Sequence, residues 1–513
     1  MNKKAIGNQL KIGVILSYLI TGLNMLVQLV YTPVMIQLLG QSEYGLYTLV
    51  GSVVSYLSLF SLGFTGAYLR FFSRYQKEND KLAVARLNGM FLSLFVAMSL
   101  AAILCGMILS CFTSQVFGTN LSVEELNKAQ ILMRFLVINI ALTFPSSLMD
   151  SIISAHEQFL FQRIVSLLGI VCNPLICLPL LIMGQGSVAV VAVTTMITIM
   201  KLVVNSWYCF RKLDISISFS NFDGTLIREI AGFSFFIFLN MIIDQINWSV
   251  DKFILGRVSG TGAVAIYGVG AQINSLYTLF STSISSVFAP RVNRIAANNS
   301  KTMKDEFTEI FIKVGRIQSL VLLLVVSGFV VFGKYFITNI YTTIEYADSY
   351  YVAMLLIIPV TVPLIQNIGL EIQRAQNKHK VRSVIYLIMA VVNTIISVPL
   401  AITYGPVGCA IGTAISLLVA NGVIMNIYYH KAIGINILAF WRSILSLLKG
   451  MLVPVGLGVI IMSRVTFHGI LSFLLGVILY AVVYVVSMWL WGMNEYEKEM
   501  IRQPLRKIIR RNK

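Results

Sequence analysis

Long apolar stretches dominate the chain from Lys11 to Trp491, and only short polar or charged segments separate them. A helix needs about 20 mostly apolar residues to cross the hydrocarbon core of a bilayer. Stretches of that length predict transmembrane helices over residues 12–38, 44–68, 87–112, 129–151, 162–183, 186–210, 231–255, 263–288, 317–337, 351–371, 383–403, 407–429, 444–463 and 468–490. The expected fold class is therefore an all-α polytopic membrane protein with about fourteen transmembrane helices.

The composition agrees with a chain that lies mainly in the membrane. Hydrophobic residues make up 57% of the sequence and charged residues only 12%, whereas soluble domains are about half apolar and one quarter charged. The first apolar stretch is longer than the core of a signal peptide, so we expect it to remain as the first transmembrane helix. The cysteines and histidines show no paired spacing of a metal site, and we predict no metal and no cofactor.

The positions of the basic residues predict the topology. If the chain alternates between the two sides, 32 of the 39 Lys and Arg residues fall on one side. Five lie on the other side, namely Lys128, Lys252, Arg257, Lys334 and Arg464, while Arg134 and Lys201 lie inside predicted spans. Because cytoplasmic loops are rich in Lys and Arg, both termini are expected in the cytoplasm.

The net charge of +18 follows largely from this distribution, so it does not indicate a nucleic-acid partner. The basic tail over residues 493–513 invites two interpretations. It either binds anionic membrane lipids of the inner leaflet or serves only orientation and solubility.

An internal repeat divides the chain. Asn24 and the segment Leu38-Leu39-Gly40 match Asn240 and Ile254-Leu255-Gly256 at an offset of 216 residues. Other matches follow at an offset of 220 residues, and they pair Tyr47 with Tyr267, Ala155 with Ala375, Asn173 with Asn393, and Pro179 with Pro399.

The repeat spans six helices, so both copies should cross the membrane in the same orientation. We predict two pseudo-symmetric six-helix lobes and two additional C-terminal helices. The expected division is an N-terminal lobe over 1–212, a C-terminal lobe over 213–430, the two added helices over 431–492, and a basic tail over 493–513.

Two predicted helices carry a polar stripe on one face, because their polar residues are three or four positions apart. The stripe in span 12–38 consists of Ser17, Thr21, Asn24, Gln28 and Tyr31. The stripe in span 231–255 consists of Asn240, Asp244, Asn247 and Asp251. The repeat places these stripes at equivalent positions, so we expect both to line a shared cavity.

Ionisable residues inside a membrane span are costly and usually face a pathway or a partner. Asp244 is the deepest carboxylate, Arg134 and Lys201 are the embedded cations, and Arg70 lies at the cytoplasmic end of span 44–68. We expect the cations to give the cavity an anion-binding wall. The alternative for Arg134 is an outward-facing side chain or a structural ion pair.

Four segments carry a resemblance to a known family. They are Gln37-Leu38-Leu39-Gly40-Gln41-Ser42-Glu43-Tyr44-Gly45-Leu46-Tyr47, Val250-Asp251-Lys252-Phe253-Ile254-Leu255-Gly256, Val264-Ala265-Ile266-Tyr267, and Tyr404-Gly405-Pro406-Val407-Gly408-Cys409-Ala410. They resemble the O-antigen and polysaccharide flippases of the multidrug/oligosaccharidyl-lipid/polysaccharide exporter superfamily. The likeness extends over nearly the whole chain.

The resemblance implies a flippase of the bacterial inner membrane that moves undecaprenyl-pyrophosphate-linked oligosaccharides from the cytoplasmic to the periplasmic leaflet by alternating access. Arg134 and Lys201 then become candidates for the pyrophosphate, and the two stripes, with Arg70, for the sugar. Asp244 and Asp251 are candidates for coupling to a proton or a sodium ion. The protein is expected to act as a monomer, with a polysaccharide polymerase complex as a further partner.

Two other functions stay open. A drug or cation antiporter of the same superfamily would use an acidic residue such as Asp244 for its ion, but such proteins usually have twelve spans. A membrane polymerase or glycosyltransferase would need a large outer loop with clustered catalytic charges. The outer connections here are short, with Glu345 and Asp348 as isolated acids, so we predict a transporter and not an enzyme.

Overall fold

A computed structural model describes residues 3–78, 80–118, 120–220, 224–298, 302–376, 378–500 and 502–503. The regular elements within these ranges are all helices. The chain divides into two compact units, Met1–Gly268 and Val269–Lys513. The all-helical fold predicted from the apolar pattern is confirmed.

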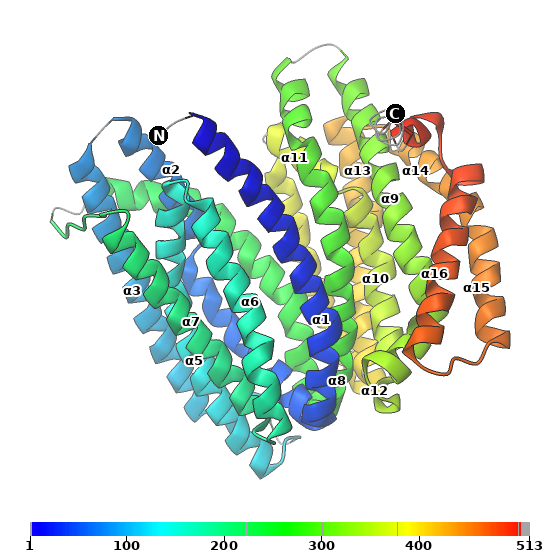
Figure 1. Cartoon of the computed structure of the whole chain (residues 1–513), viewed down its shortest axis with the longest axis horizontal. Coiled ribbons are helices and arrows are strands. Elements are labelled where there is room, and N and C mark those ends of the chain that lie inside the picture. The colour runs from blue at the N-terminus through cyan, green and yellow to red at the C-terminus, as the bar shows by residue number, and fades with distance from the viewer. Residues whose placement is uncertain are drawn as a thin grey trace. The chain divides into compact units, whose positions relative to one another are not determined.

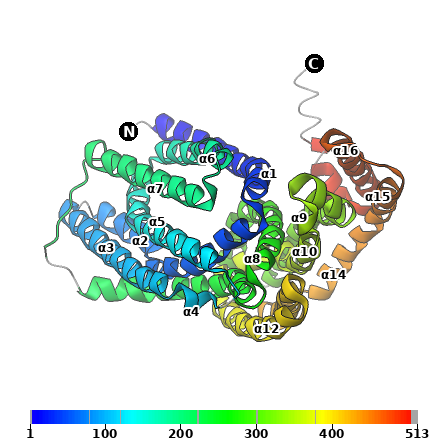
Figure 2. The same ribbon diagram turned by 90° about the horizontal axis from the view of Figure 1, so that it is seen from below.

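Within the described residues, the first unit contains seven α-helices and the beginning of an eighth. Figures 1 and 2 show their arrangement. These are α1 (Lys3–Val54), α2 (Phe64–Lys77), α3 (Lys81–Cys111), α4 (Thr113–Phe117), α5 (Val123–Ala155), α6 (Phe159–Ile182), α7 (Gly186–Arg211) and α8 (Gly224–Asn298), with a short 3-10 segment at Ser55–Ser61. Helix α5 packs against α3 and α7, and α1 packs against α6. Aromatic residues such as Phe91 and Phe95 fill the interior, while large apolar residues such as Leu104 stay exposed, as lipid-facing side chains do.

The second unit contains the rest of α8 and the helices that follow it. These are α9 (Met303–Tyr335), α10 (Ser349–Ile365), α11 (Ile368–Ala375), α12 (His379–Leu417), α13 (Met425–Tyr428), α14 (Ile437–Leu445), α15 (Leu452–Arg464) and α16 (Ile470–Ser487). Helices α15 and α16 pack on each other and on α9 (Figures 1 and 2). The contact is a buried cluster of Phe332, Ile461, Phe473 and Tyr480.

Three long helices change direction at a glycine. Gly40 in α1, Gly260 in α8 and Gly405 in α12 have φ angles of 76°, 82° and 59°, which only glycine adopts at little cost. Each of these glycines lies between two predicted spans. The breaks therefore occur where the sequence predicts the chain to leave one span and enter the next.

Ten helices in the described ranges are long and apolar enough to cross a membrane. Helices α10 and α11, which are bent by 43° at their junction, make an eleventh if they form one span. Three of the ten contain a glycine break and could each provide two spans. The total is fourteen spans only if each of these three helices provides two spans and α10 with α11 forms one. Fourteen spans therefore stays a prediction.

The glycine breaks also correct the alignment of the internal repeat. Gly40 and Gly260 have nearly the same backbone angles and are 220 residues apart, as are Tyr47 and Tyr267. Gly40 therefore corresponds to Gly260 and not to Gly256. In this register Asn24 aligns with Asp244, one helical turn beyond Asn240.

The predicted domain boundaries at residues 212, 430 and 492 stay predictions. The compact units follow contacts in the folded chain, whereas the predicted boundaries follow the duplication of the sequence. Helix α8 runs through Gly268, where the first unit ends. Residues 501 and 504–513 of the predicted tail lie outside the described residues.

Candidate substrate-binding site

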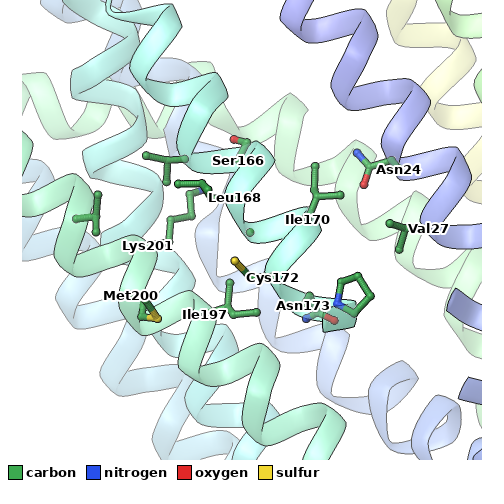
Figure 3. A pocket seen from close by; sticks show the side chains of 14 residues that line it. Asn24, Val27, Ser166, Leu168, Ile170, Cys172, Asn173, Ile197, Met200 and Lys201 are labelled. Atoms are coloured by element: carbon green, nitrogen blue, oxygen red, sulfur yellow. The ribbon is translucent and has the colours of Figure 1, made fainter. Parts of the chain in front are cut away.

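A cavity of about 510 Å³ lies in the first unit between α1, α6 and α7 (Figure 3). Its wall is mainly apolar, with Val27, Ile170, Ile197 and Met200 among the lining residues. The polar lining side chains are those of Asn24, Ser166, Asn173 and Lys201. An apolar cavity with a few polar groups and one cation suits a largely apolar ligand that carries an anionic group.

The sequence of α6 explains part of the shape of this cavity. Pro174 lies inside the helix and has no N–H, so it cannot bond to the carbonyl of Ile170. Both residues line the cavity. Gly169 lines it as well, and a Cβ added there would lie 3.7 Å from the side chain of Ile197, so the absence of a side chain leaves open space between α6 and α7.

Lys201 forms an ion pair that the sequence analysis missed. Its Nζ lies 2.7 Å from Oδ2 of Asp150 on α5, and Asn205 donates a hydrogen bond of 2.8 Å to the other carboxylate oxygen. The side chains of Lys201 and Asp150 remain 36% and 21% exposed. Lys201 therefore lines the cavity with its charge balanced by a neighbouring acid.

Lys201 belongs to a polar stripe along α7. The stripe consists of Thr194, Thr198, Lys201 and Asn205, which are four, three and four residues apart and so share one face. Asn173 on α6 donates to Thr194 at 3.3 Å, and Asn139 on α5 donates to Thr198 at 3.0 Å. These hydrogen bonds satisfy polar groups between α5, α6 and α7, where an unpaired polar group would be costly.

Arg134 does not share a site with Lys201. It is exposed on α5, on a face with the exposed residues Ile131 and Ile138. Arg134 precedes Asp150 by 16 residues, which is about 24 Å along a helix at 1.5 Å per residue. Because Lys201 contacts Asp150, one pyrophosphate cannot reach both cations in this structure.

The polar stripe of α1 enters the cavity at only one of its predicted site residues. Asn24 lines the cavity (Figure 3), while Gln28 is partly buried further along the helix. Tyr31 lies beside Cys177 of α6. The stripe thus continues from the cavity into the contact between α1 and α6.

The stripe of α8 passes from an exposed to a buried environment. Asn240 and Asp244 are exposed and Asn247 is partly buried, whereas Asp251 is fully buried and accepts a hydrogen bond from Tyr267. The four residues therefore do not line one uniform wall. Arg70, the remaining predicted site residue, is exposed on α2.

Another face of α8 packs against the end of α1 and the 3-10 segment that follows it. Gln245 donates hydrogen bonds to Ser55 and Ser249, and Ser61 contacts the sulfur of Met241. This contact leaves Asn240 and Asp244 on the exposed side of α8.

The first turns of α5 and α7 meet the glycine breaks of α1 and α8 at a helix-end junction that the sequence analysis also missed. Glu43 of α1 accepts hydrogen bonds from Lys128 Nζ at 2.7 Å and from the backbone N–H of Ser187 at 2.6 Å. Glu125 of α5 accepts from Ser42 at 2.6 Å and from Thr261 of α8 at 2.8 Å. The junction comprises Ser42, Glu43, Glu125, Lys128, Ser187 and Thr261.

One part of this junction has a sequence signature. Ser122 and Glu125 form a capping box at the start of α5, and this pattern of Ser followed three residues later by Glu can be recognised in a sequence. The residues of the junction lie in or beside the predicted outer connections 38–44, 112–129, 183–186 and 255–263. Their meeting agrees with the predicted alternation of sides, while the cytoplasmic location of the termini stays a prediction.

Comparison with known proteins gives two family matches. Residues 10–296, more than half of the chain, match the family described as polysaccharide biosynthesis protein. Residues 236–398 match the MatE family. A putative O-antigen transporter of Shigella flexneri is 22% identical over 261 residues, which cover 50% of this chain and 60% of that protein.

Solved structures share the fold at low sequence identity. The lipid II flippase MurJ in an inward closed conformation has a TM-score of 0.72 at 16% identity and covers 95% of this chain and 100% of its own. An inward-facing multidrug MATE transporter has a TM-score of 0.59 at 16% identity and covers 82% and 99%. The predicted relationship is confirmed: the chain belongs to the polysaccharide biosynthesis protein family, within the multidrug/oligosaccharidyl-lipid/polysaccharide exporter superfamily.

Proposed function

We propose that the protein flips a polyprenyl-pyrophosphate-linked oligosaccharide from the cytoplasmic to the outer leaflet of a bacterial inner membrane. The family match over residues 10–296 supports a role in polysaccharide synthesis and favours a transporter over an enzyme. The name of the Shigella relative, a putative O-antigen transporter, supports a lipid-linked sugar as the cargo.

The observation that carries the proposal is the position of Lys201 on the wall of an apolar cavity within the helical bundle. An ammonium group binds phosphate oxygens as a point charge, and the apolar wall suits part of a prenyl chain. The amides of Asn24 and Asn173 provide hydrogen bonds for sugar hydroxyl groups. One site thus offers a partner for each chemical part of the cargo.

The transport cycle is proposed to be alternating access between two duplicated lobes, with both termini in the cytoplasm. Arg134 and the remaining predicted site residues would contact the cargo at other stages of this cycle, since they lie outside the cavity. These residues are Arg70, Gln28, Tyr31, Asn240 and Asn247. Monomeric action and a polymerase partner remain part of the proposal.

Replacing Lys201 by methionine is expected to reduce surface polysaccharide at least tenfold, because it removes the one cation among the described residues that line the cavity. A loss of about 1.4 kcal/mol in binding corresponds to a tenfold change. The measurement is surface polysaccharide in a strain that lacks the chromosomal gene and carries each variant on a plasmid. Lys201→Arg should retain part of the function.

Lys313→Met serves as the control, because Lys313 pairs with Glu309 on the surface of α9. Equal membrane abundance of all variants is required. Normal surface polysaccharide with Lys201→Met would contradict the proposed site.

Asp244→Asn is expected to abolish gradient-driven transport and to leave binding of the lipid-linked substrate nearly unchanged. Asp244 is exposed on the polar face of α8, where a carboxylate can take up a proton or a sodium ion, and the amide cannot. Transport in proteoliposomes with and without an imposed ion gradient measures the coupling. Equal stimulation of wild type and variant by the gradient would refute this role, and Asp251→Asn tests the second candidate in the same assay.

Drug or cation export is the second candidate function, because residues 236–398 match the MatE family. The MATE structures cover 82–86% of this chain, whereas the lipid II flippase covers 95%. The closer correspondence in length supports the lipid-linked cargo. Deletion of the gene should therefore deplete surface polysaccharide without changing drug susceptibility, and the opposite result would favour the antiporter.

A further inference from the structure

The ion pair between Lys201 and Asp150 leaves bonding capacity on both partners. An ammonium group has three N–H donors, and within the described residues Lys201 uses one, toward Oδ2 of Asp150 at 2.7 Å. The other oxygen of Asp150 accepts from Asn205 at 2.8 Å. Lys201 can therefore bind a second anion, and Asp150 keeps a partner if Lys201 turns away.

A second ion pair of the same chain has the features of a structural pair that stays closed. Arg316 and Glu497 are only 6% and 3% exposed, and Arg316 also donates to Ser443, Ser446 and the carbonyl of Gly492. By contrast, Lys201 and Asp150 are 36% and 21% exposed, and Lys201 lines the cavity, so a ligand can reach their contact.

We infer that Asp150 is an internal competitor for the anionic group of the cargo. In the empty protein its carboxylate occupies Lys201 and balances an ammonium group that would otherwise stand alone inside the membrane. An incoming diphosphate replaces the Asp150 carboxylate as the ionic partner of the Lys201 ammonium group. The carboxylate keeps its hydrogen bond from Asn205. The same competition lowers the affinity for the diphosphate and so promotes its release. This inference rests on the proposed function of the cavity.

The competition predicts that removal of the acid tightens binding. Asp150→Asn keeps the size of the side chain and an oxygen for Asn205, but it removes the charge that competes for Lys201. The full-length protein in phosphatidylcholine nanodiscs is titrated with radiolabelled farnesyl diphosphate. We expect Asp150→Asn to bind this probe about tenfold more tightly than wild type, and Lys201→Met to bind it at least tenfold more weakly.

The double variant Asp150→Asn/Lys201→Met should bind as weakly as Lys201→Met, because the acid acts only through the lysine. Farnesol, which has no charge, should bind equally to all four proteins. Inorganic pyrophosphate should follow the same order as farnesyl diphosphate at lower affinity, since it leaves the apolar wall uncovered. Glu309→Gln, which removes the acid of an exposed pair on α9, is the matched control and should not change the affinity.

The outcomes separate the inference from the proposed function. If Lys201→Met abolishes binding but Asp150→Asn weakens it or leaves it unchanged, Asp150 has a structural role and the inference is overturned while the substrate site stands. A lower melting temperature of Asp150→Asn would accompany that result. If neither substitution changes the affinity for farnesyl diphosphate, the cavity does not bind the diphosphate, and both the site and the inference fail.

Discussion

Replacing Arg316 by methionine is expected to lower the free energy of unfolding by about 3–5 kcal/mol, because it leaves the carboxylate of Glu497 buried without its charged partner. The guanidinium contacts both carboxylate oxygens of Glu497 and the carbonyl groups of Ser443 and Gly492. These contacts connect α9 to the segments before α15 and after α16. The substitution should therefore loosen the C-terminal helices first.

Thermal unfolding in detergent measures the loss, and limited proteolysis of the α15–α16 region shows where it begins. Arg316→Met/Glu497→Met should recover much of the stability, since no lone buried charge remains. Lys313→Met is the control on the same helix. Its ion pair with Glu309 is partly exposed and its ammonium lies 4.8 Å from the centre of the Tyr496 ring, and each of these contacts should contribute no more than about 1 kcal/mol. Equal stability of Arg316→Met and Lys313→Met would show that the buried pair does not hold these helices.

The helices could be predicted from the sequence because each long apolar stretch has only one way to satisfy its backbone in lipid. The breaks at Gly40, Gly260 and Gly405 could also be placed, since each lies between two apolar stretches. The sequence does not reveal how short the connections are, because a single glycine with non-helical backbone angles joins the two helices at each break. Backbone angles, and not hydropathy, distinguish a kinked helix from two helices with a loop.

The candidate site could be predicted only in part. Lys201 and Asn24 were identified because polar residues inside an apolar stretch stand out. Asp150 lies at the end of span 129–151, where a charged residue is unremarkable, and its contact with Lys201 joins residues 51 positions apart. Such a pairing depends on how α5 packs against α7, and hydrophobic periodicity does not predict which helices pack together.

The polar stripe of α7 can also be recognised from the spacing of its residues in the sequence. Thr194, Thr198, Lys201 and Asn205 have the same spacing as the stripe identified in span 231–255. Because threonine is common in apolar helices, it indicates a polar stripe less strongly than aspartate does. Arg134 illustrates the reverse case, since its charge suggested a shared site with Lys201 that the length of α5 rules out for this structure.

Gly45→Ala is expected to open the contact between α1 and α8 at the helix-end junction and to reduce transport strongly. A Cβ at this position would lie 1.9 Å from the carbonyl oxygen of Thr261 and 2.6 Å from its carbonyl carbon. Backbone atoms cannot move aside as a flexible side chain can. The two helices would have to separate by more than 1 Å to reach ordinary contact distance, and the hydrogen bonds from Ser42 and Thr261 to Glu125 would then break.

Disulfide cross-linking measures this separation directly, because the hydroxyl oxygens of Ser42 and Thr261 are 3.3 Å apart. With Ser42→Cys and Thr261→Cys, oxidation should link the two helices rapidly, and mass spectrometry of the linked peptides identifies the product. The cysteine pair already lacks both hydroxyl donors to Glu125, so lower cross-linking with Gly45→Ala would report the separation of the two helices alone. In the protein that keeps Ser42 and Thr261, these two hydrogen bonds to a charged carboxylate contribute about 1.5–3 kcal/mol each, and their loss should reduce transport by at least tenfold. Gly51→Ala is the matched control on the same helix, since no atom lies within 4 Å of its added Cβ. Because Gly51→Ala changes helix propensity in the same direction without a clash, equal cross-linking in the two variants would show that close approach at Gly45 does not hold the junction together.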